Sequence, residues 1–180
     1  MFRMHAVLVS VLATSCLAES PAKPKVEKSR AVDQTGLGPS YKVFRSLEGD
    51  FEISLPGSPP RKEEEKSGVS AIEYQSGEKG LSQVVTVFRE RKGGTIPLAS
   101  LAEDTKTLLG NPPLKRSRLF GHEALELEGL ASSEQTPGKQ LRVAMTLLSV
   151  PPDLVYSFMS FGPTTQTHAA WVATFRLLKP

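Results

Sequence analysis

The sequence predicts an α+β fold, with a mostly antiparallel sheet of about six to eight strands and two main helices packed on it. Residues 141–150 and 154–161 are two long apolar runs joined by a Pro-Pro-Asp turn. Because consecutive positions in both runs are apolar, each predicted strand needs cover on both of its faces. A Gly-Pro pair then ends the sheet, and residues 164–178 have the spacing of a closing helix that covers one face.

The preceding residues supply further predicted strands for the same sheet. Period-two alternation and Gly- or Pro-rich turns place strands at residues 41–47, 50–55, 69–76, 80–91, 114–120 and 123–130. The third and fourth form a hairpin across Gly77–Gly80, and the last two form a hairpin that turns at Gly121-His122. The charged run RKEEEKSG, residues 61–68, is typical of a solvated loop or a strand end.

The first helix is predicted over residues 96–110. Thr95 is a candidate cap, and Pro97 suits the first turn because the amide it lacks has no partner there. Gly110 is a suitable stop.

The closing helix carries an apolar stripe that includes Trp171 and Phe175, and we expect both rings to fill the core against the sheet. His168 lies at the edge of this stripe. We expect it to be a hydrogen-bonded boundary residue rather than a ligand.

The N-terminus has the parts of a secretory signal, namely Arg3 and a following apolar stretch. Leu12 to Cys16 resembles a bacterial lipobox, although Ala13 stands where that pattern prefers leucine. We therefore predict a signal peptide at residues 1–15 and lipidation of Cys16, which is the single cysteine of the chain. The alternative is conventional cleavage before Glu19, which gives a soluble periplasmic or secreted protein.

Residues 16–40 are rich in Pro, Lys, Ser and Gly, a composition that predicts a disordered tether. The folded domain is then residues 41–180. The formal charge is +3, and removal of Arg3 leaves +2, which gives no electrostatic case for nucleic acid.

Six basic residues form a possible patch, if the two strands that carry them are neighbours. They are Arg89, Arg91, Lys92, Lys115, Arg116 and Arg118. Such a patch suits anionic lipid head groups or an acidic partner protein. The ordinary interpretation is scattered charge that protects strand edges.

No catalytic or cofactor motif is present in the sequence. Only His122 and His168 lie beyond the leader, without the spacing of a zinc site, so we expect no metal and no cofactor. There is no nucleophile elbow, phosphate-binding glycine loop or dinucleotide fingerprint. A hydrolase would need a nonlocal site in which one of these histidines meets a serine and a carboxylate.

The domain resembles the PsbP-like superfamily, and within it the DcrB-type bacterial envelope proteins. The resemblance rests on residues 50–57 with Pro59, on residues 121–129, and on Tyr156-Ser157-Phe158 before the closing helix. It spans residues 41–178 and implies an α/β/α sandwich without shared active-site residues. The resemblance therefore implies a non-catalytic protein.

These observations predict an exported, lipid-anchored, non-catalytic protein of a bacterial envelope. We expect it to act as a binding or accessory module, in which the sheet face or edge away from the closing helix meets an envelope partner. One alternative is a carrier of a small ligand or lipid, with an apolar cleft between a helix and the sheet that Trp171 and Phe175 do not fill. The other is the hydrolase described above.

Overall fold

The computed structural model describes Leu37 and residues 40–46, 50–66, 68–78, 81–91, 93–132, 140–151, 153–162 and 165–178. The predicted signal peptide, Cys16 and nearly all of the predicted tether lie outside these ranges. Among the described residues, the first strand begins at Tyr41.

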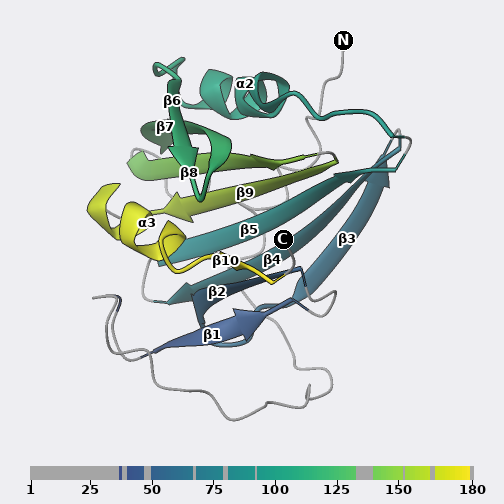
Figure 1. The fold of residues 1–180 in the computed structure, drawn as a ribbon. Coiled ribbons are helices and arrows are strands. Elements are labelled where there is room, and N and C mark those ends of the chain that lie inside the picture. The colour runs from purple at the N-terminus through teal and green to yellow at the C-terminus, as the bar shows by residue number, and fades with distance from the viewer. Residues whose placement is uncertain are drawn as a thin grey trace.

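The described residues form an α+β fold, as the sequence predicts (Figure 1). The elements in chain order are β1 Tyr41–Arg45, β2 Phe51–Pro56, β3 Arg61–Lys66, β4 Val69–Glu78, β5 Leu81–Glu90, α2 Leu98–Leu108, β6 Lys115–Leu119, β7 His122–Ser132, β8 Gln140–Val150, β9 Leu154–Phe161, α3 Thr165–Val172 and β10 Arg176–Leu177.

The main sheet has seven strands in the order β3-β4-β5-β9-β8-β7-β6. Every neighbouring pair is antiparallel. The late hairpin of β8 and β9 lies in the interior of this sheet, and its register pairs Thr146 with Phe158. Its continuous apolar sequence is thereby explained, because strands with neighbours on both edges and cover on both faces expose almost no side chain to water.

A second sheet of three strands, in the order β1-β2-β10, corrects the prediction that all strands join one sheet. The indole N–H of Trp171 in α3 donates to the carbonyl oxygen of Ser54 in β2 at 2.8 Å. The hydroxyl of Ser76 in β4 donates to the carbonyl of Pro56, so the small sheet is also bonded to the main one. Within the described part of the chain, β1 and β2 therefore pair with no strand of the main sheet, and instead their side chains cover one of its faces.

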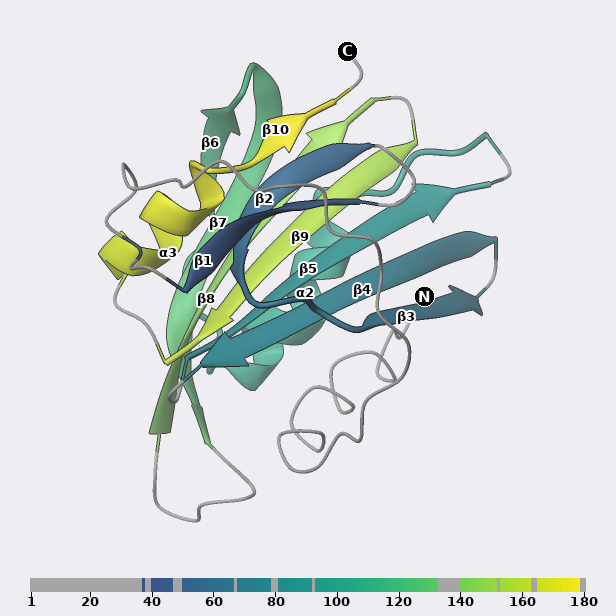
Figure 2. The same cartoon turned by 90° about the horizontal axis from the view of Figure 1, so that it is seen from below.

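The two faces of the main sheet are covered by different elements (Figure 2). α3 and the three-stranded sheet cover one face, with a core that includes Phe51, Ile53, Leu55, Tyr74, Val85, Tyr156, Phe158, Trp171 and Phe175. α2 packs on β7 and β8 at the opposite face, with a core that includes Phe88, Leu98, Ala102, Leu109, Leu125, Leu127, Met145, Leu147 and Met159. The expected cover on both faces is present.

The closing helix is shorter than predicted. It ends at Val172, after which the chain turns and Arg176 and Leu177 pair with β2 as β10. Trp171 and Phe175 are both fully buried, as predicted, but Phe175 lies beyond the helix. Across the described part of the chain, neither helix is long and apolar enough to cross a membrane.

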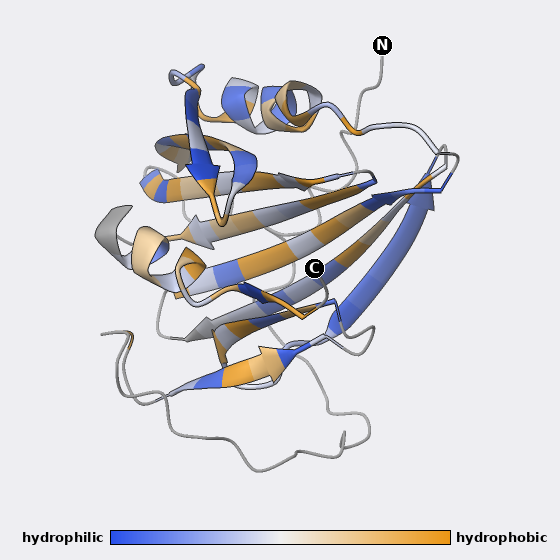
Figure 3. Cartoon of the chain, in the orientation of Figure 1, coloured by the Kyte–Doolittle hydropathy of each residue, from blue (hydrophilic) through white to orange (hydrophobic). Residues whose placement is uncertain are grey.

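Two local predictions are wrong. Residues 61–66 form strand β3, with every residue exposed, because an edge strand needs backbone partners but no apolar side chains. Figure 3 shows this strand as hydrophilic along its length. α2 begins after Pro97, which is its N-cap without a side-chain hydrogen bond, so Thr95 does not cap it.

Candidate functional site

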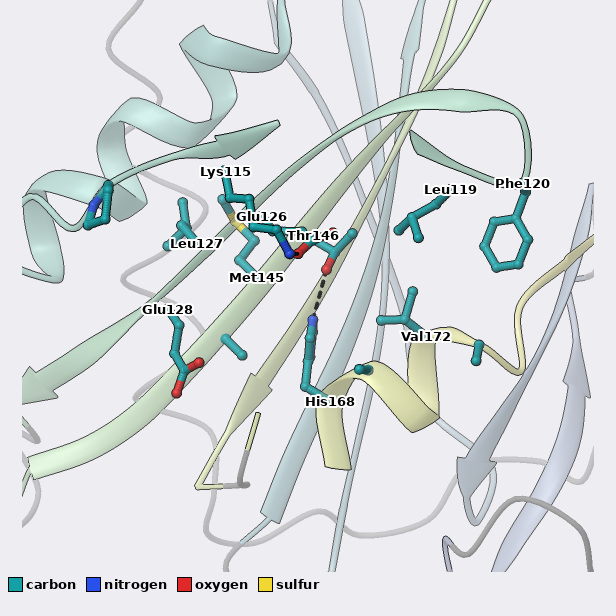
Figure 4. Close-up of a pocket in the computed structure, with 14 residues that line it drawn as sticks. Lys115, Leu119, Phe120, Glu126, Leu127, Glu128, Met145, Thr146, His168 and Val172 are labelled. Carbon is teal, nitrogen blue, oxygen red and sulfur yellow. Dashed lines mark hydrogen bonds and ion pairs between the residues drawn. The ribbon is translucent and has the colours of Figure 1, made fainter. Parts of the chain in front are cut away.

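A cleft of about 430 Å³ lies between α3 and the β6, β7 and β8 side of the main sheet (Figure 4). Most of its lining residues carry apolar side chains. The lining comprises Pro113, Lys115, Leu119, Phe120, Glu126, Leu127, Glu128, Ala144, Met145, Thr146, His168, Ala169, Val172 and Ala173. Trp171 and Phe175 are not among them, because both rings are buried in the adjacent core. The cleft is therefore of the kind expected for the small-ligand carrier.

His168 projects from α3 into a position between two strands. Its Nε2 lies 3.0 Å from the hydroxyl of Thr146 in β8, and its Nδ1 lies 2.8 Å from the hydroxyl of Ser160 in β9. Burial lowers the pKa of His168 to about 4, although the carboxylates of Glu126 and Glu128 act in the opposite direction. The imidazole is thus neutral at pH 7, with one nitrogen donating and the other accepting. The prediction that His168 is hydrogen-bonded is confirmed, but the side chain is buried in the core and does not lie at its boundary.

Two carboxylates, Glu126 and Glu128, lie two residues apart on the same face of β7 and both line the cleft. Glu126 accepts hydrogen bonds from the Ser117 hydroxyl at 2.6 Å and from the Lys115 ammonium at 3.2 Å. Glu128 forms an ion pair with Arg142 at 3.2 Å. Burial alone would raise the pKa of Glu126, but the bonds from Ser117 and Lys115 outweigh burial and the pKa is lowered. Glu126 is therefore ionised at neutral pH.

The other end of the cleft is apolar and is formed by the tip of the β6–β7 hairpin. Leu119 pairs with His122, so Phe120 and Gly121 make a two-residue turn. Their φ angles are 53° and 84°, as a type I′ turn requires. The Phe120 side chain is 44% exposed, and its ring centroid lies 5.7 Å from that of the buried Phe175. The turn thus lies one residue earlier than the predicted Gly121-His122.

The six predicted basic residues do not form one patch. Arg89 and Arg91 belong to β5 and its end, whereas Lys115, Arg116 and Arg118 belong to β6, and three strands separate β5 from β6. The condition that these strands are neighbours is not met. Lys92 lies outside the described residues.

Most of these basic side chains also have acidic partners. Arg89 bonds to Asp50 at 2.9 Å, Arg91 to Glu65 at 3.2 Å, and Lys115 to Glu126 at 3.2 Å. Arg116 lies 3.9 Å from Glu123. Of the five members of the set that the structure describes, only Lys115 lines the cleft.

The geometry that a hydrolase would need is incomplete. His168 does meet a serine, but Ser160 is fully buried and does not line the cleft. The second nitrogen of His168 bonds to Thr146, where a triad would place a carboxylate. His122 starts β7 beside the hairpin turn. Among the described residues, no group of three His, Cys, Asp or Glu side chains is arranged to hold a metal ion.

Sequence reasoning missed the residues that surround His168. Thr146 and Ser160 are polar positions inside the two apolar runs, and that interruption was the available signal. Leu125 and Leu127 belong to the core under α2, and strand alternation places Glu126 and Glu128 on the opposite face. The sequence did not show that α3 lies on the same side as these carboxylates.

Comparison with known proteins adds little to this description. No protein-family model matches the sequence, and no curated protein matches it. The chain is similar in structure to a protein of unknown function from Pseudomonas aeruginosa, with 15% sequence identity and a TM-score of 0.34, over 74% of this chain and 92% of that one. A likeness of this size supports no conclusion about function.

Proposed function

We propose that this protein is a non-catalytic binding protein that holds a small, largely apolar molecule in the cleft beside α3. The observation that carries the proposal is the cleft itself. Its volume of about 430 Å³ is open although the aromatic core next to it is complete. Small-molecule sites in proteins commonly have volumes of roughly 300–1,000 Å³.

The walls of the cleft support an apolar ligand. Leu119, Phe120, Val172 and two alanines of the α3 region offer hydrocarbon surface, and burial of such surface contributes about 25 cal/mol per Å². The polar groups of the cleft already have partners within the protein: His168 bonds two hydroxyls, and Glu126 bonds Ser117 and Lys115. A ligand can therefore bind without leaving any of them unsatisfied.

The same contacts favour binding over catalysis. A general base needs a nitrogen that can reach the proton of a substrate or a nucleophile. Both nitrogens of His168 are engaged, and the serine it contacts has no exposed surface.

Export and anchoring complete the proposal, and they rest on the sequence. The leader and Cys16 support a lipid-anchored envelope protein, and the PsbP-like resemblance supports the same compartment. In that setting the protein carries or buffers an apolar compound near a membrane. The accessory role with an envelope protein partner stays a prediction, because no contact among the described residues favours one surface for it.

The test is equilibrium binding of Nile red, a neutral apolar dye, to the full chain. Ala169 is exposed and lines the cleft, so Ala169→Phe fills the cleft without displacing core residues. Ala99 is exposed on α2 at the opposite face, and Ala99→Phe adds the same ring away from the cleft. We expect at least tenfold weaker binding for Ala169→Phe and no change for Ala99→Phe, with both variants folded by circular dichroism. No binding to the unchanged chain, or equal binding by all three proteins, would contradict the proposal.

A further inference from the structure

We infer that the cleft selects an amphipathic amine, whose cationic head lies at the Glu126 and Glu128 end and whose hydrocarbon chain extends to the hairpin tip at Phe120. This inference rests on the proposed function and names the chemistry of its ligand. It follows from the order of residues along β7, the burial of the charges, and the half-exposed aromatic residue Phe120.

The two ends of the cleft lie at different positions along the β6–β7 hairpin, with Leu119 and Phe120 at its tip and Glu126 and Glu128 within β7. From the hairpin tip, His122 is followed on the strand by Ala124, Glu126 and Glu128, which alternate with the leucines of the opposite face. The four-residue step from His122 to Glu126 spans about 13 Å along the strand. The register pairs Glu126 with Thr146, the residue that bonds His168. The polar groups therefore lie together, about 13 Å along the strand from the apolar tip.

Figure 4 shows where these residues lie. Leu119, Phe120 and Val172 lie on one side of the view, Glu128 lies on the other side together with Leu127 and Met145, and His168 lies between them. A molecule with one polar end and one hydrocarbon end fits this distribution better than a molecule of uniform polarity.

Burial decides the sign of the head group. The Glu126 and Glu128 side chains are 31% and 32% exposed, whereas Lys115, the cation of the cleft lining, is 74% exposed. Charges farther from water are screened less, so the two carboxylates dominate the potential inside the cleft. His168 is neutral and does not oppose them. A cationic head is attracted there, and a carboxylate head is repelled.

The existing ion pairs limit the size of this preference. Glu126 has Lys115 and Glu128 has Arg142, and an amine must compete with one largely exposed and one half-exposed cation. Exposed pairs of this kind contribute only a small part of a binding free energy. The carboxylates therefore determine which head group is preferred, while the hydrocarbon chain of the ligand supplies most of the binding affinity.

Phe120 supplies the surface for the far end of the chain. Its φ of 53° is a left-handed conformation that a bulky residue rarely adopts, and its ring is 44% exposed at the mouth of the cleft. Figure 3 shows the apolar tip of this hairpin beside a hydrophilic β6. A hydrocarbon chain that leaves the cleft at this end covers the exposed face of the ring.

The experiment is displacement of Nile red from the full chain by decylammonium, decanol and decanoate, each below its micelle concentration. We expect decylammonium to bind about fivefold more tightly than decanol, and decanoate to bind most weakly. Glu128→Gln should reduce the decylammonium preference about two- to fivefold and leave decanol unchanged. Glu103→Gln, on the exposed side of α2 and paired only with Lys106 among the described residues, is the matched control and should change nothing.

A second variant tests the hydrocarbon end. Asparagine tolerates the left-handed conformation, so Phe120→Asn keeps the turn and removes the ring. It should weaken all three decyl compounds by a similar factor.

The outcomes separate this inference from the proposed function. If decanol or decanoate binds as tightly as decylammonium, and Ala169→Phe abolishes that binding, the inference of an amine head group is wrong. The proposed function, binding of an apolar molecule in this cleft, is then still supported. If none of the three displaces the bound dye, the amine inference is wrong, and the proposed function is decided by Nile red binding to the unchanged chain and to Ala169→Phe. A decylammonium preference that survives Glu128→Gln and Glu126→Gln together would also overturn the inference.

Discussion

The Ser160 hydroxyl lies 2.8 Å from Nδ1 of His168, so that β9 and α3 are bonded to each other inside the core. On the other side of the ring, the Thr146 hydroxyl of β8 lies 3.0 Å from Nε2. The histidine thus fixes α3 over two central strands, and the open cleft begins beside it. Its protonation is coupled to the stability of the fold because an imidazolium would be buried there.

The first prediction concerns pH. The pKa of His168 is about 4 in the folded protein, against an ordinary value of 6.5 when unfolded. Between these values the unfolded chain binds the proton first, so this contribution is fully present above pH 6.5 and is lost as the pH falls towards 4. We expect the free energy of unfolding, measured with urea, to fall by about 2 kcal/mol from pH 7 to pH 5 through this residue.

His168→Gln provides the comparison for that measurement. The variant should be less stable at pH 7 by about 1–3 kcal/mol, because its amide does not reproduce the hydrogen bonds to the Thr146 and Ser160 hydroxyls. Its free energy of unfolding should not show the fall between pH 7 and pH 5 that comes from His168. Identical pH dependence of the two proteins between pH 7 and pH 5 would show that His168 is not buried in its neutral form.

The second prediction concerns the bond between α3 and the small sheet. Trp171→Phe removes the N–H that donates to the Ser54 carbonyl and leaves a smaller ring. We expect the free energy of unfolding to fall by about 1–3 kcal/mol. Tyr156→Phe is the control, because the buried Tyr156 hydroxyl has no partner among the described residues. Removal of this hydroxyl should leave the free energy of unfolding unchanged or raise it. A larger fall in that free energy for Tyr156→Phe than for Trp171→Phe would contradict this assignment.

The third prediction concerns the close approach of α2 and β7. A Cβ at Gly129 would lie 2.8 Å from Cβ of Leu109 and 3.2 Å from its carbonyl oxygen. Gly129→Ala must displace the end of α2, and we expect a loss of about 1–3 kcal/mol in thermal or urea unfolding. At Gly94 the nearest atom is 3.3 Å away, in the flexible Glu90 side chain, so Gly94→Ala should cost much less. Equal losses of stability for Gly129→Ala and Gly94→Ala would show that α2 and β7 are not in close contact at Gly129.

The fourth prediction concerns the N-terminus. We expect mass spectrometry of the mature protein from a bacterial envelope to find an N-terminal Cys16 that carries a diacylglycerol and an amide-linked acyl chain. Cys16→Ala should move the protein from the membrane fraction to the soluble fraction, because the hydrocarbon chains supply the anchoring free energy. An unmodified N-terminus at Glu19 would disprove lipidation.

Much of the fold was predictable because burial leaves a clear pattern. The apolar runs at residues 141–150 and 154–161 identified two interior strands, since only strands covered on both faces show such runs. β10 was not predictable, because two residues carry no periodicity and pair with β2 only through the tertiary fold. β3 was missed for a related reason: its charges indicate solvent, which is where an edge strand lies.

The sequence predicted the kind of candidate site but not its position. A cleft between a helix and the sheet was among the expectations, but its position depends on where α3 lies across the sheet. Alternation showed that Glu126 and Glu128 share a face. Alternation does not show what covers that face, and in the structure α3 lies beside it and the cleft lies between them. Packing of elements far apart in the chain is not encoded in any local pattern.

The most direct test of the binding site is nuclear magnetic resonance of the full chain with ¹³C-labelled decylammonium. We expect intermolecular nuclear Overhauser effects from the ligand chain to the methyl groups of Val172 and Leu119 and to the Phe120 ring, which line the cleft. Leu108 and Leu130 are the natural controls, because both are exposed and neither lines the cleft. Contacts to Leu108 or Leu130, with none to Val172 and Leu119, would contradict the account.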